Sequence, residues 1–305
     1  KSMIEINNNP LRLHVLVSYA YFNSTTHMQR LQEFASEWNV MLDSGAFTNF
    51  TLGRRATPIE EYADFCRQYS NLWWRIINLD RIGDGETSHR NLMYLHKSNV
   101  KALPVFTRGE SFSELAAMKQ TGSPVCIGGI SQNVNSRAEK RYLKQVMKFV
   151  HSNQIPVHLL GVAGMALFKW QPFSGDNSSW MMPCRYGHVE LFYRGKFHKF
   201  DRKSTVKPNL ERTSVLRSYD LTWGDLQEHR KWSISGFGND GNSAVYLAGT
   251  RSYMRLARVL AKNNVRAIMA VAPGHVKAHK TIQPIPKTLN CRPFNGIPTG
   301  KRQLS

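Results

Sequence analysis

The feature that most constrains this chain is a regular alternation of short apolar runs with segments of helical spacing. Before residue 165, six apolar runs have strand length, and they cover residues 13–20, 40–42, 74–79, 102–106, 124–127 and 156–160. Helical spacing follows several of them, most clearly over residues 26–38, 58–69, 86–97 and 138–151. Such alternation is typical of a parallel sheet, and this many repeats favours a closed (β/α)8 TIM-like barrel over an open sheet. The segment around Asp176 would supply a seventh strand and residues 266–271 an eighth.

This pattern predicts one α/β catalytic domain over residues 1–272, with an insertion at about 185–207. The insertion alternates apolar and polar residues around an Arg194-Gly195 turn, which predicts a β-hairpin. A long helix is expected from about residue 243 to 264. Residues 273–305 are rich in Pro, Gly, Lys and Arg without periodicity, so we expect an irregular basic arm there.

The charge balance is strongly basic, because 41 Lys and Arg residues outnumber 21 Asp and Glu residues and give a net charge of +20. A polyanion is the expected partner. No acidic residue follows Asp240, whereas 11 basic residues do. The residues expected to contact nucleic acid lie near the hairpin and on one stripe of the C-terminal helix: Arg185, Arg194, Lys196, Lys199, Arg251, Arg255, Arg258 and Lys262. The alternative is that both regions are ordinary solvated surfaces.

Other features narrow the class of protein by exclusion. The sequence has no apolar run of about 20 residues and no secretory signal, so a cytoplasmic protein without a membrane partner is expected. The 4 cysteines are scattered and form no Cys-x-x-Cys pair, which predicts neither a disulfide framework nor a zinc site. His275 and His279 have helical spacing but no intervening Glu, so the metalloprotease motif is missing. We therefore expect no metal.

Two carboxylates follow predicted strands and stand among small residues. Asp43 begins Asp-Ser-Gly-Ala-Phe directly after the run 40–42, and Asp176 lies in Phe-Ser-Gly-Asp-Asn-Ser-Ser-Trp. Barrel enzymes place their chemistry at the carboxyl ends of strands, and paired carboxylates carry out reactions at glycosidic bonds. The alternative for either residue alone is a helix cap or a turn, which Asp commonly forms.

Five short motifs occur in order at predicted strand ends. They are Asp43 to Phe47, Asn78 to Asp80, Cys126 to Ile130, His158 to Val162, and Asp176 followed by Arg185-Tyr186-Gly187. In order and spacing the chain resembles the tRNA-guanine transglycosylase superfamily, and most closely its phage and bacterial DNA-guanine transglycosylase branch (DpdA). The resemblance covers roughly residues 40 to 187, and no motif covers the C-terminal third.

The resemblance implies a (β/α)8 barrel that exchanges a guanine in a polynucleotide for a free 7-deazaguanine. By position, Asp176 corresponds to the nucleophile that holds the sugar covalently. Asp43 corresponds to the acid/base that assists the leaving guanine and accepts a proton from the incoming base. The base-binding positions are Asp80 at the Watson–Crick edge, Gly128 and Gly129 at the carbonyl, Phe47 and Leu160 on the two faces of the ring, and Ser44 and Gly161 beside them.

Two departures from the tRNA enzymes favour DNA as the substrate. This chain has Ala46 and Thr48 where those enzymes usually have Gly and Gln, and it lacks their zinc site of three Cys and one His. The expected function is DNA-guanine transglycosylase on double-stranded DNA with the target guanine flipped out, with free 7-deazaguanine as co-substrate and no cofactor. For a phage protein the location would be the host cytoplasm.

Three alternatives remain open from the sequence. The chain could act on tRNA, or it could be a noncatalytic nucleic-acid-binding subunit of the same superfamily. A phosphate-ester hydrolase is disfavoured, because no cluster of metal ligands is visible. The sequence leaves open the deazapurine, the DNA sequence context and the oligomeric state, for which a monomer is one option.

Overall fold

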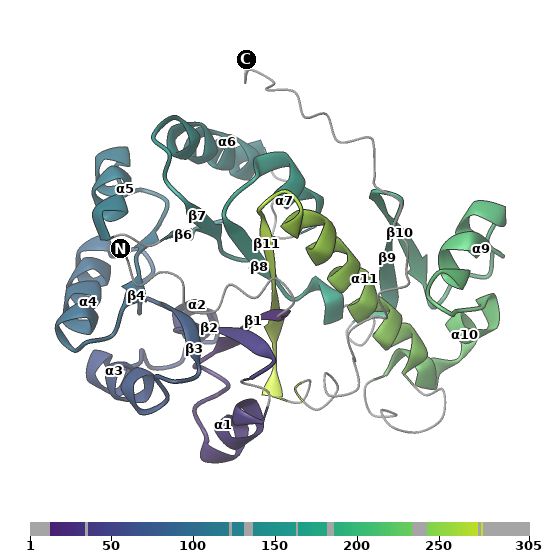
Figure 1. Cartoon of the computed structure of the whole chain (residues 1–305), viewed down its shortest axis with the longest axis horizontal. Coiled ribbons are helices and arrows are strands. Elements are labelled where there is room, and N and C mark those ends of the chain that lie inside the picture. The colour runs from purple at the N-terminus through teal and green to yellow at the C-terminus, as the bar shows by residue number, and fades with distance from the viewer. Residues whose placement is uncertain are drawn as a thin grey trace. The chain divides into compact units, whose positions relative to one another are not determined.

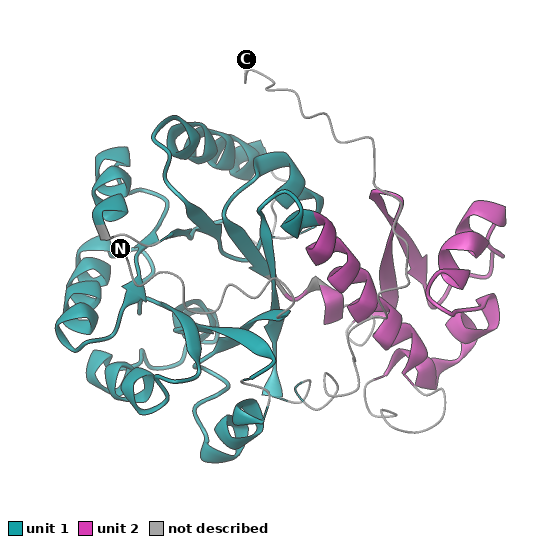
Figure 2. Ribbon diagram, in the orientation of Figure 1, with its two compact units in different colours: residues 1–177, 260–276 teal, residues 178–259, 277–305 magenta. Residues whose placement is uncertain are grey.

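The computed structural model describes residues 13–33, 36–121, 124–130, 137–162, 164–181, 186–233, 243–273 and 276. The chain divides into two compact units, residues 1–177 with 260–276 and residues 178–259 with 277–305 (Figure 2). The sequence predicts one domain over residues 1–272, whereas the structure distributes these residues between the two units. The predicted arm at 273–305 lies almost wholly outside the described residues.

The first unit is built on one parallel sheet with helices outside it (Figure 1). Among the described residues the sheet has nine strands in the order β4-β3-β2-β1-β11-β8-β7-β6-β5. Their bounds are β1 (Leu13–Ser18), β2 (Trp38–Asp43), β3 (Trp73–Ile77), β4 (Ala102–Leu103), β5 (Val105–Phe106), β6 (Val125–Ile127), β7 (Val157–Leu159), β8 (Ser174–Asn177) and β11 (Arg266–Val271).

The two ends of this strand order are joined through Pro104. Strand β4 pairs with β3 and β5 pairs with β6, and only Pro104 separates β4 from β5 in the chain. Proline has no N–H to give to the ladder, which explains the interruption, although its carbonyl accepts from the Cys126 N–H at 2.8 Å. The sheet is therefore a nearly closed barrel, compatible with a TIM-like barrel, and the predicted α/β class with a parallel sheet is confirmed.

Helices on the outside of this sheet connect successive strands (Figure 1). They are α1 (Thr25–Gln32), α2 (Ala46–Thr51), α3 (Ile59–Gln68), α4 (Gly85–Lys97), α5 (Phe112–Met118), α6 (Arg137–Ser152) and α7 (Met165–Trp170), with a short 3-10 turn η1 (Lys119–Thr121). Helix α6 shows why they pack as they do, because Leu143, Val146, Met147 and Val150 recur on one face and are buried. Helix α2 is the exception, since none of its residues is buried.

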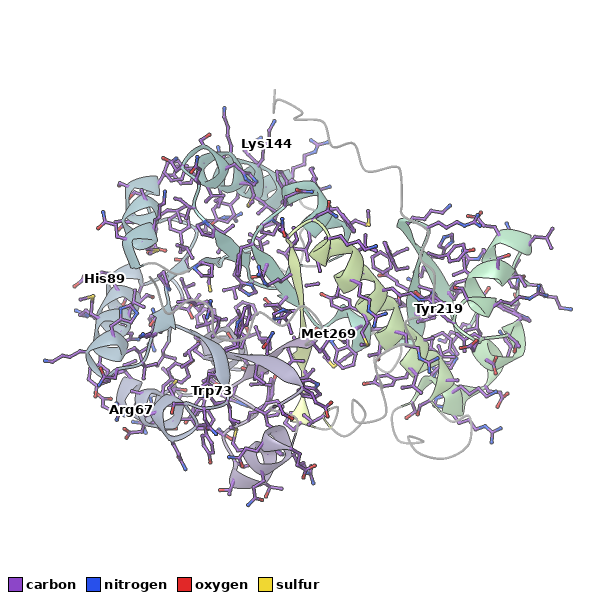
Figure 3. The ribbon with its side chains drawn as sticks, viewed as in Figure 1. Arg67, Trp73, His89, Lys144, Tyr219 and Met269 are labelled. Atoms are coloured by element: carbon purple, nitrogen blue, oxygen red, sulfur yellow. The ribbon has the colours of Figure 1, made fainter. Side chains whose placement is uncertain are left out.

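Side chains fill the interior of the barrel (Figure 3). One buried cluster takes a residue from each of several strands: Leu16, Met41, Ile77, Leu103, Val105, Cys126 and Ile268. Side chains alternate between the two faces of a strand, so residues two positions before or after these also face inward. This alternation places polar residues at both ends of the barrel interior, above and below an apolar middle.

The second unit has its own core. The predicted hairpin is present as β9 (His188–Tyr193) and β10 (Lys196–Asp201), an antiparallel pair that turns at Arg194 and Gly195. Its other elements are η2 (Ser179–Met181), α9 (Leu210–Arg217), α10 (Trp223–Gln227), η3 (His229–Trp232) and most of α11 (Ala244–Ala261). Leu191, Phe200, Leu216 and Trp232 are buried together in this core. Among the described residues, no helix is both long and apolar enough to cross a membrane.

Candidate active site

Three aspartates stand at or near the carboxyl ends of three barrel strands, of which β2 and β3 are neighbours while β1 and β11 separate β2 from β8. Asp43 is the last residue of β2, Asp176 lies in β8, and Asp80 follows β3. The negative charge of Asp176 raises the pKa of Asp43, and that of Asp43 raises the pKa of Asp80. The structure thus brings together all three carboxylates that the sequence singled out, in one electrostatic environment at one rim of the barrel.

The pKa of Asp43 is raised to about 6, chiefly by burial and then by repulsion from Asp176. The Gly45 N–H donates to Asp43 Oδ2 at 3.0 Å and opposes this rise. This hydrogen bond forms a local turn, which is one of the two alternatives for Asp43 given from the sequence. The other alternative, a helix cap, does not apply, because Gly45 is the N-cap of α2. A carboxyl group with a pKa near 6 can both give and take a proton near neutral pH.

Glycine is required at position 45 for two reasons. Its φ is +74°, and an added Cβ would lie 2.7 Å from the Ala20 Cβ and 2.8 Å from the Ala20 N. The turn that follows Asp43 can therefore press against the end of β1 only without a side chain.

Asp176 is held by contacts from β7 and the loop after it. Its Oδ1 accepts from the Gly161 N–H at 3.0 Å and lies 3.2 Å from His158 Nε2. That second approach lacks the alignment of a hydrogen bond. His158 is fully buried, and its Nδ1 is 2.9 Å from the Ser174 hydroxyl, which fixes the plane of the imidazole. Asp176 is only 7% exposed, so these contacts determine where its carboxylate points.

The glycine before Asp176 is equally constrained. A Cβ on Gly175 would lie 2.6 Å from Leu167 Cδ2 and 2.6 Å from the Val162 carbonyl oxygen. Strand β8 can approach the loop after β7 because this position has no side chain. The position of the Asp176 carboxylate beside the Gly161 N–H depends on that approach.

The pKa of Asp80 is higher than that of Asp43. Burial is the main cause, the charge of Asp43 is the second, and together with smaller effects they raise the pKa of Asp80 to about 7. The buried Ser44 lies close enough to oppose this rise by hydrogen bonding, and Ser44 directly follows Asp43. The Asp80 N–H donates to the Asn78 carbonyl at 3.0 Å, and buried Asn78 donates from Nδ2 to the Ser88 carbonyl at 2.8 Å.

The remaining predicted base-binding residues differ in burial and in their hydrogen bonds. Gly128 is buried, its N–H donates to the Phe106 carbonyl at 2.8 Å, and an added Cβ would lie 3.7 Å from Leu160 Cδ1. Gly129 is exposed with φ +66°. Leu160 packs against the barrel core, whereas Phe47 lies on α2 with 54% of its surface exposed. Gly161 gives its N–H to Asp176, so this amide holds the Asp176 carboxylate and is not free to donate to a ligand.

Three residues of the site are not predicted as site residues from the sequence: His158, Glu110 and Cys126. Glu110 accepts from the Thr107 hydroxyl at 2.9 Å, and its charge adds to the rise in the pKa of Asp80. Burial, and then the charges of Asp176, Asp80 and Asp43, raise the pKa of the Cys126 thiol well above its usual range. The charges of all three acids therefore act on this buried thiol. A polar residue at an inward position of an apolar strand, as at 158, is the signal that could have identified His158.

The aspartates are close enough to shift one another's pKa without forming a metal centre. Among the described residues, no group of three or more His, Cys, Asp or Glu side chains is placed to hold a metal ion. Cys66 and Cys126 are buried free thiols, and Cys184 and Cys291 lie outside the described residues.

The predicted nucleic-acid contacts fall into two groups. Several are already engaged within the second unit: Lys196 with Glu211 at 2.8 Å, Lys199 with Asp201 at 3.6 Å and Arg251 with Asp220 at 3.6 Å. Arg255 is partly buried, with its guanidinium 3.9 Å from the Tyr219 ring centroid and its Nη1 3.2 Å from the Ser218 hydroxyl. Arg255 thus packs against other residues of the second unit, although it belongs to the stripe of the C-terminal helix that was expected to contact nucleic acid.

The other predicted contacts remain available to a partner. Arg194, at the hairpin turn, is exposed. Arg258 is exposed on α11, and Lys262 is exposed one residue beyond the end of that helix at Ala261. Arg185 lies outside the described residues.

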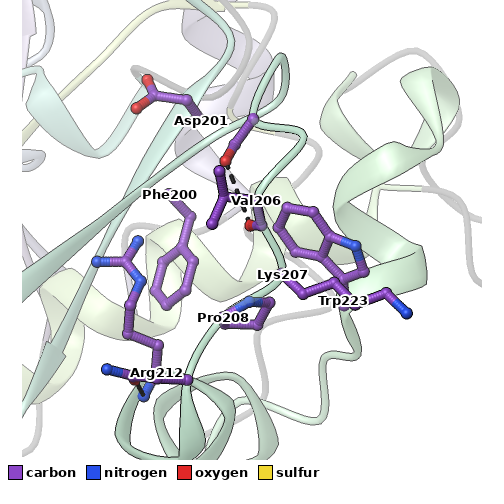
Figure 4. A pocket seen from close by; sticks show the side chains of 9 residues that line it. Phe200, Asp201, Val206, Lys207, Pro208, Arg212 and Trp223 are labelled. Carbon is purple, nitrogen blue, oxygen red and sulfur yellow. Dashed lines mark hydrogen bonds between the residues drawn. The ribbon is translucent and has the colours of Figure 1, made fainter.

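A cavity of about 310 Å³ in the second unit has a different chemistry (Figure 4). Its lining comprises Phe200, Asp201, Ser204, Val206, Lys207, Pro208, Asn209, Arg212 and Trp223. Arg212 lies over the Phe200 ring at 4.3 Å. The single carboxylate in this lining offers no acid pair, so the barrel rim is the better candidate for catalysis.

No protein-family model matches the chain, and neither the curated proteins nor the solved structures compared with it give a significant match. The geometry of the barrel rim is what bears on function.

Proposed function

We propose that this protein is a DNA-guanine transglycosylase that exchanges guanine in DNA for a free 7-deazaguanine base. The observation that carries the proposal is the pair Asp43 and Asp176. These two acids lie at one rim of the barrel, and their different surroundings suit one to be a nucleophile and the other an acid/base. Asp176 is fixed by the Gly161 N–H and His158, whereas Asp43 has a pKa of about 6. Pairs of acids with distinct environments are the usual basis for separate nucleophile and acid/base roles.

The proposed reaction is a double displacement. A carboxylate oxygen of Asp176 bonds to C1′ of the deoxyribose as the bond from C1′ to the base nitrogen N9 breaks, and protonated Asp43 gives its proton to the departing guanine. Ionised Asp43 then takes the N9 proton of the incoming base, which attacks C1′ and releases Asp176. Two displacements at one carbon retain its configuration.

Recognition of the base is assigned to Asp80 and Gly129. An ionised Asp80 can accept from the ring N–H and the amino group of guanine. Because its pKa is about 7 in the unliganded site, these two donors would draw it into the ionised form. The Gly128 N–H is already used by the Phe106 carbonyl, so we assign the Gly129 amide as donor to the base carbonyl. Phe47 at the rim and Leu160 at the core would contact the two faces of the ring.

Charge and surface features support a polynucleotide substrate. The net charge is +20, and the helix beside Asp43 exposes Phe47 and Phe50 by 54% and 65%, next to exposed Arg54 and Arg55. Exposed aromatics beside cations suit stacking bases and phosphates. We also propose that residues 102–106 act as one strand interrupted at Pro104, which makes the sheet the eight-stranded (β/α)8 barrel of the superfamily.

A noncatalytic subunit is the less favourable interpretation, because the acids cost stability. Burial and mutual repulsion raise the pKa values of Asp43 and Asp80, so keeping both ionised at neutral pH destabilises the fold. A subunit that only binds nucleic acid has no use for this arrangement.

The test is a base-exchange assay on two substrates. The protein would be incubated with radiolabelled 7-cyano-7-deazaguanine and either duplex DNA or tRNA, with the Asp43→Asn/Asp176→Asn double variant as the control. We expect label in the duplex DNA and none with the control. Incorporation into tRNA alone would change the substrate to tRNA, and incorporation into neither would refute the proposed function.

A further inference from the structure

The amino-terminal end of the barrel holds a second cluster of polar residues that the proposed chemistry does not use. His14 is near the start of β1, Asn39 near the start of β2, and Arg266 opens β11. Each stands two positions before a buried member of the barrel core, so alternation along the strand points all three to the interior at the end opposite to the aspartates. Arg75 is the middle residue of β3, where the register with β2 shifts, and it pairs with Met41 of the core, so it faces the same interior.

Contacts join these residues into one cluster. The His14 and Trp74 rings lie 4.7 Å apart, and the Arg75 guanidinium is 5.0 Å from the centroid of the same Trp74 ring. Burial and then the charge of Arg266 lower the pKa of both His14 and Arg75. Arg266 itself lies 4.4 Å over the Phe173 ring. The two arginines and the histidine therefore share one positive field.

This positive field lacks a counter-charge. Among the described residues, no carboxylate oxygen lies within the 4.0 Å of an ion pair to Arg75 or Arg266. Arg75 Nη1 donates to the neighbouring Trp74 carbonyl at 3.0 Å. Partly buried cations without an anion are costly, since burial removes water and like charges repel. The arrangement is relieved when an anion binds.

The cluster also offers neutral donors without partners. Asn39 is 2% exposed, and its Nδ2 has no hydrogen-bond partner among the described residues. Within the same residues Nδ1 of His14, the register partner of Asn39 on β1, also has none. Buried amide donors are normally satisfied, so an unpaired one beside two cations points to an absent acceptor.

We infer that the amino-terminal end of the barrel binds a small phosphate-type oxyanion, held by Arg75 and Arg266 with Asn39 Nδ2 as a further donor. Guanidinium groups match tetrahedral oxyanions with paired hydrogen bonds. Because both guanidinium groups are partly buried, a free ion or the terminal phosphate of a small molecule reaches them more readily than the backbone of a duplex. This site is independent of the proposed base exchange.

The test is calorimetric titration of the whole protein with inorganic phosphate, at constant ionic strength maintained with potassium chloride. Wild-type protein and the Arg90→Gln control, which alters an exposed arginine of α4, should bind one phosphate with equal affinity. Arg75→Gln and Arg266→Gln should each bind at least about tenfold more weakly. A second arm uses ribose 5-phosphate, a phosphomonoester without the guanine base that the proposed function places at Asp80. It separates a free ion from a phosphomonoester, since only the preferred source binds more tightly.

Thermal unfolding gives an independent check on the same variants. Without phosphate, Arg266→Gln should melt no lower than the wild type, because it removes an uncompensated charge, and its melting temperature should respond less to added phosphate. No saturable binding of either ligand by the wild type would overturn the inference. So would equal phosphate affinity in the wild type and both cluster variants.

Discussion

Asp43 and Asp176 are the same residue type in different surroundings, and the difference predicts separable defects. Asp176→Ala should abolish base exchange while leaving DNA affinity within a few-fold, because its proposed role is covalent and not adhesive. Asp201→Ala, which alters an exposed residue of β10, is the control and should retain activity. Exchange and DNA binding would be measured on the same preparations. A denaturation-resistant adduct between DNA and Asp176→Ala would contradict the assignment of the nucleophile.

The raised pKa of Asp80 has a consequence for stability. The folded state binds this proton more tightly than the unfolded chain, so Asp80 favours folding below the unfolded value near 3.8. That contribution is lost as the pH rises through about 7. Asp80→Asn should therefore raise the free energy of unfolding at pH 8, by on the order of 2 to 4 kcal/mol, and change it little at pH 4.

Denaturant unfolding at the two pH values measures this effect, and Asp84→Asn is its matched control. Asp84 caps α4 by accepting from the Thr87 N–H at 2.9 Å, and that hydrogen bonding lowers its pKa. Neutralising Asp84 should not stabilise the protein at pH 8. Equal stabilities for wild type and Asp80→Asn at pH 8 would show that Asp80 is not held in an unfavourable environment.

Within α11, two arginines three residues apart are expected to behave oppositely. Arg255 packs on Tyr219 and Ser218, so Arg255→Gln should lower stability by about 1 kcal/mol and leave the salt dependence of DNA binding nearly unchanged. Arg258 is exposed, so Arg258→Gln should keep stability and lower the slope of log affinity against log salt by about 1. Unfolding curves and DNA titrations over a range of salt would separate the two. Identical slopes in wild type and Arg258→Gln would remove α11 from the DNA contact.

The second element that bears on substrate contact is α2. Its six residues bury nothing, and Phe50 is 65% exposed. If α2 contacts bases next to the extruded guanine, Phe50→Ala should slow exchange in duplex DNA by about tenfold and slow it much less when the target guanine is already unpaired. Leu210→Ala, at another exposed apolar residue, should have no effect on either substrate. Equal slowing on both substrates would argue against a role in base extrusion.

At the scale of the whole molecule, each of the two units has a separate core, which predicts separable protection from hydrogen exchange. Trp232 is 1% exposed and its Nε1 donates to the Leu226 carbonyl at 3.0 Å in the second unit. Trp232→Ala should destabilise that unit by about 3 to 5 kcal/mol and speed amide exchange in β9 and β10. Amides of β1 and β2 should exchange as in the wild type. Equal acceleration in both units would mean that they unfold together.

Sequence reasoning was most accurate where local pattern decides structure. The strands around 40–42 and 266–271 were predicted because apolar runs between turns are a local signal. Helix α2 was not predicted, since its six residues, none of them buried, are too few to show apolar periodicity. The helix expected over 26–38 is shorter in the structure, where α1 ends at Gln32. A separate second unit is not predicted, because its core joins the hairpin predicted at about 185–207 to residues far apart in the sequence.

The residues of the candidate site also differ in whether a local sequence pattern identifies them. Asp43, Asp80 and Asp176 could be found because each follows a strand, and barrel topology then brings strand ends together. His158 has a weaker signal, a polar residue at an inward position of an apolar strand. Glu110 has none, because its effect on Asp80 depends on a proximity that only the folded chain sets. The same limit applies to Arg255, whose partner Tyr219 lies on a different element.

The close approach at Gly175 restricts how this protein can evolve. Every amino-acid replacement of glycine adds a Cβ, which here would lie 2.6 Å from the backbone oxygen of Val162, and that oxygen cannot move aside as a flexible side chain could. No smaller amino acid exists to serve as an intermediate step. We therefore expect homologues that retain the position of Asp176 to retain glycine at 175. The surrounding apolar residues can change in volume if they change together.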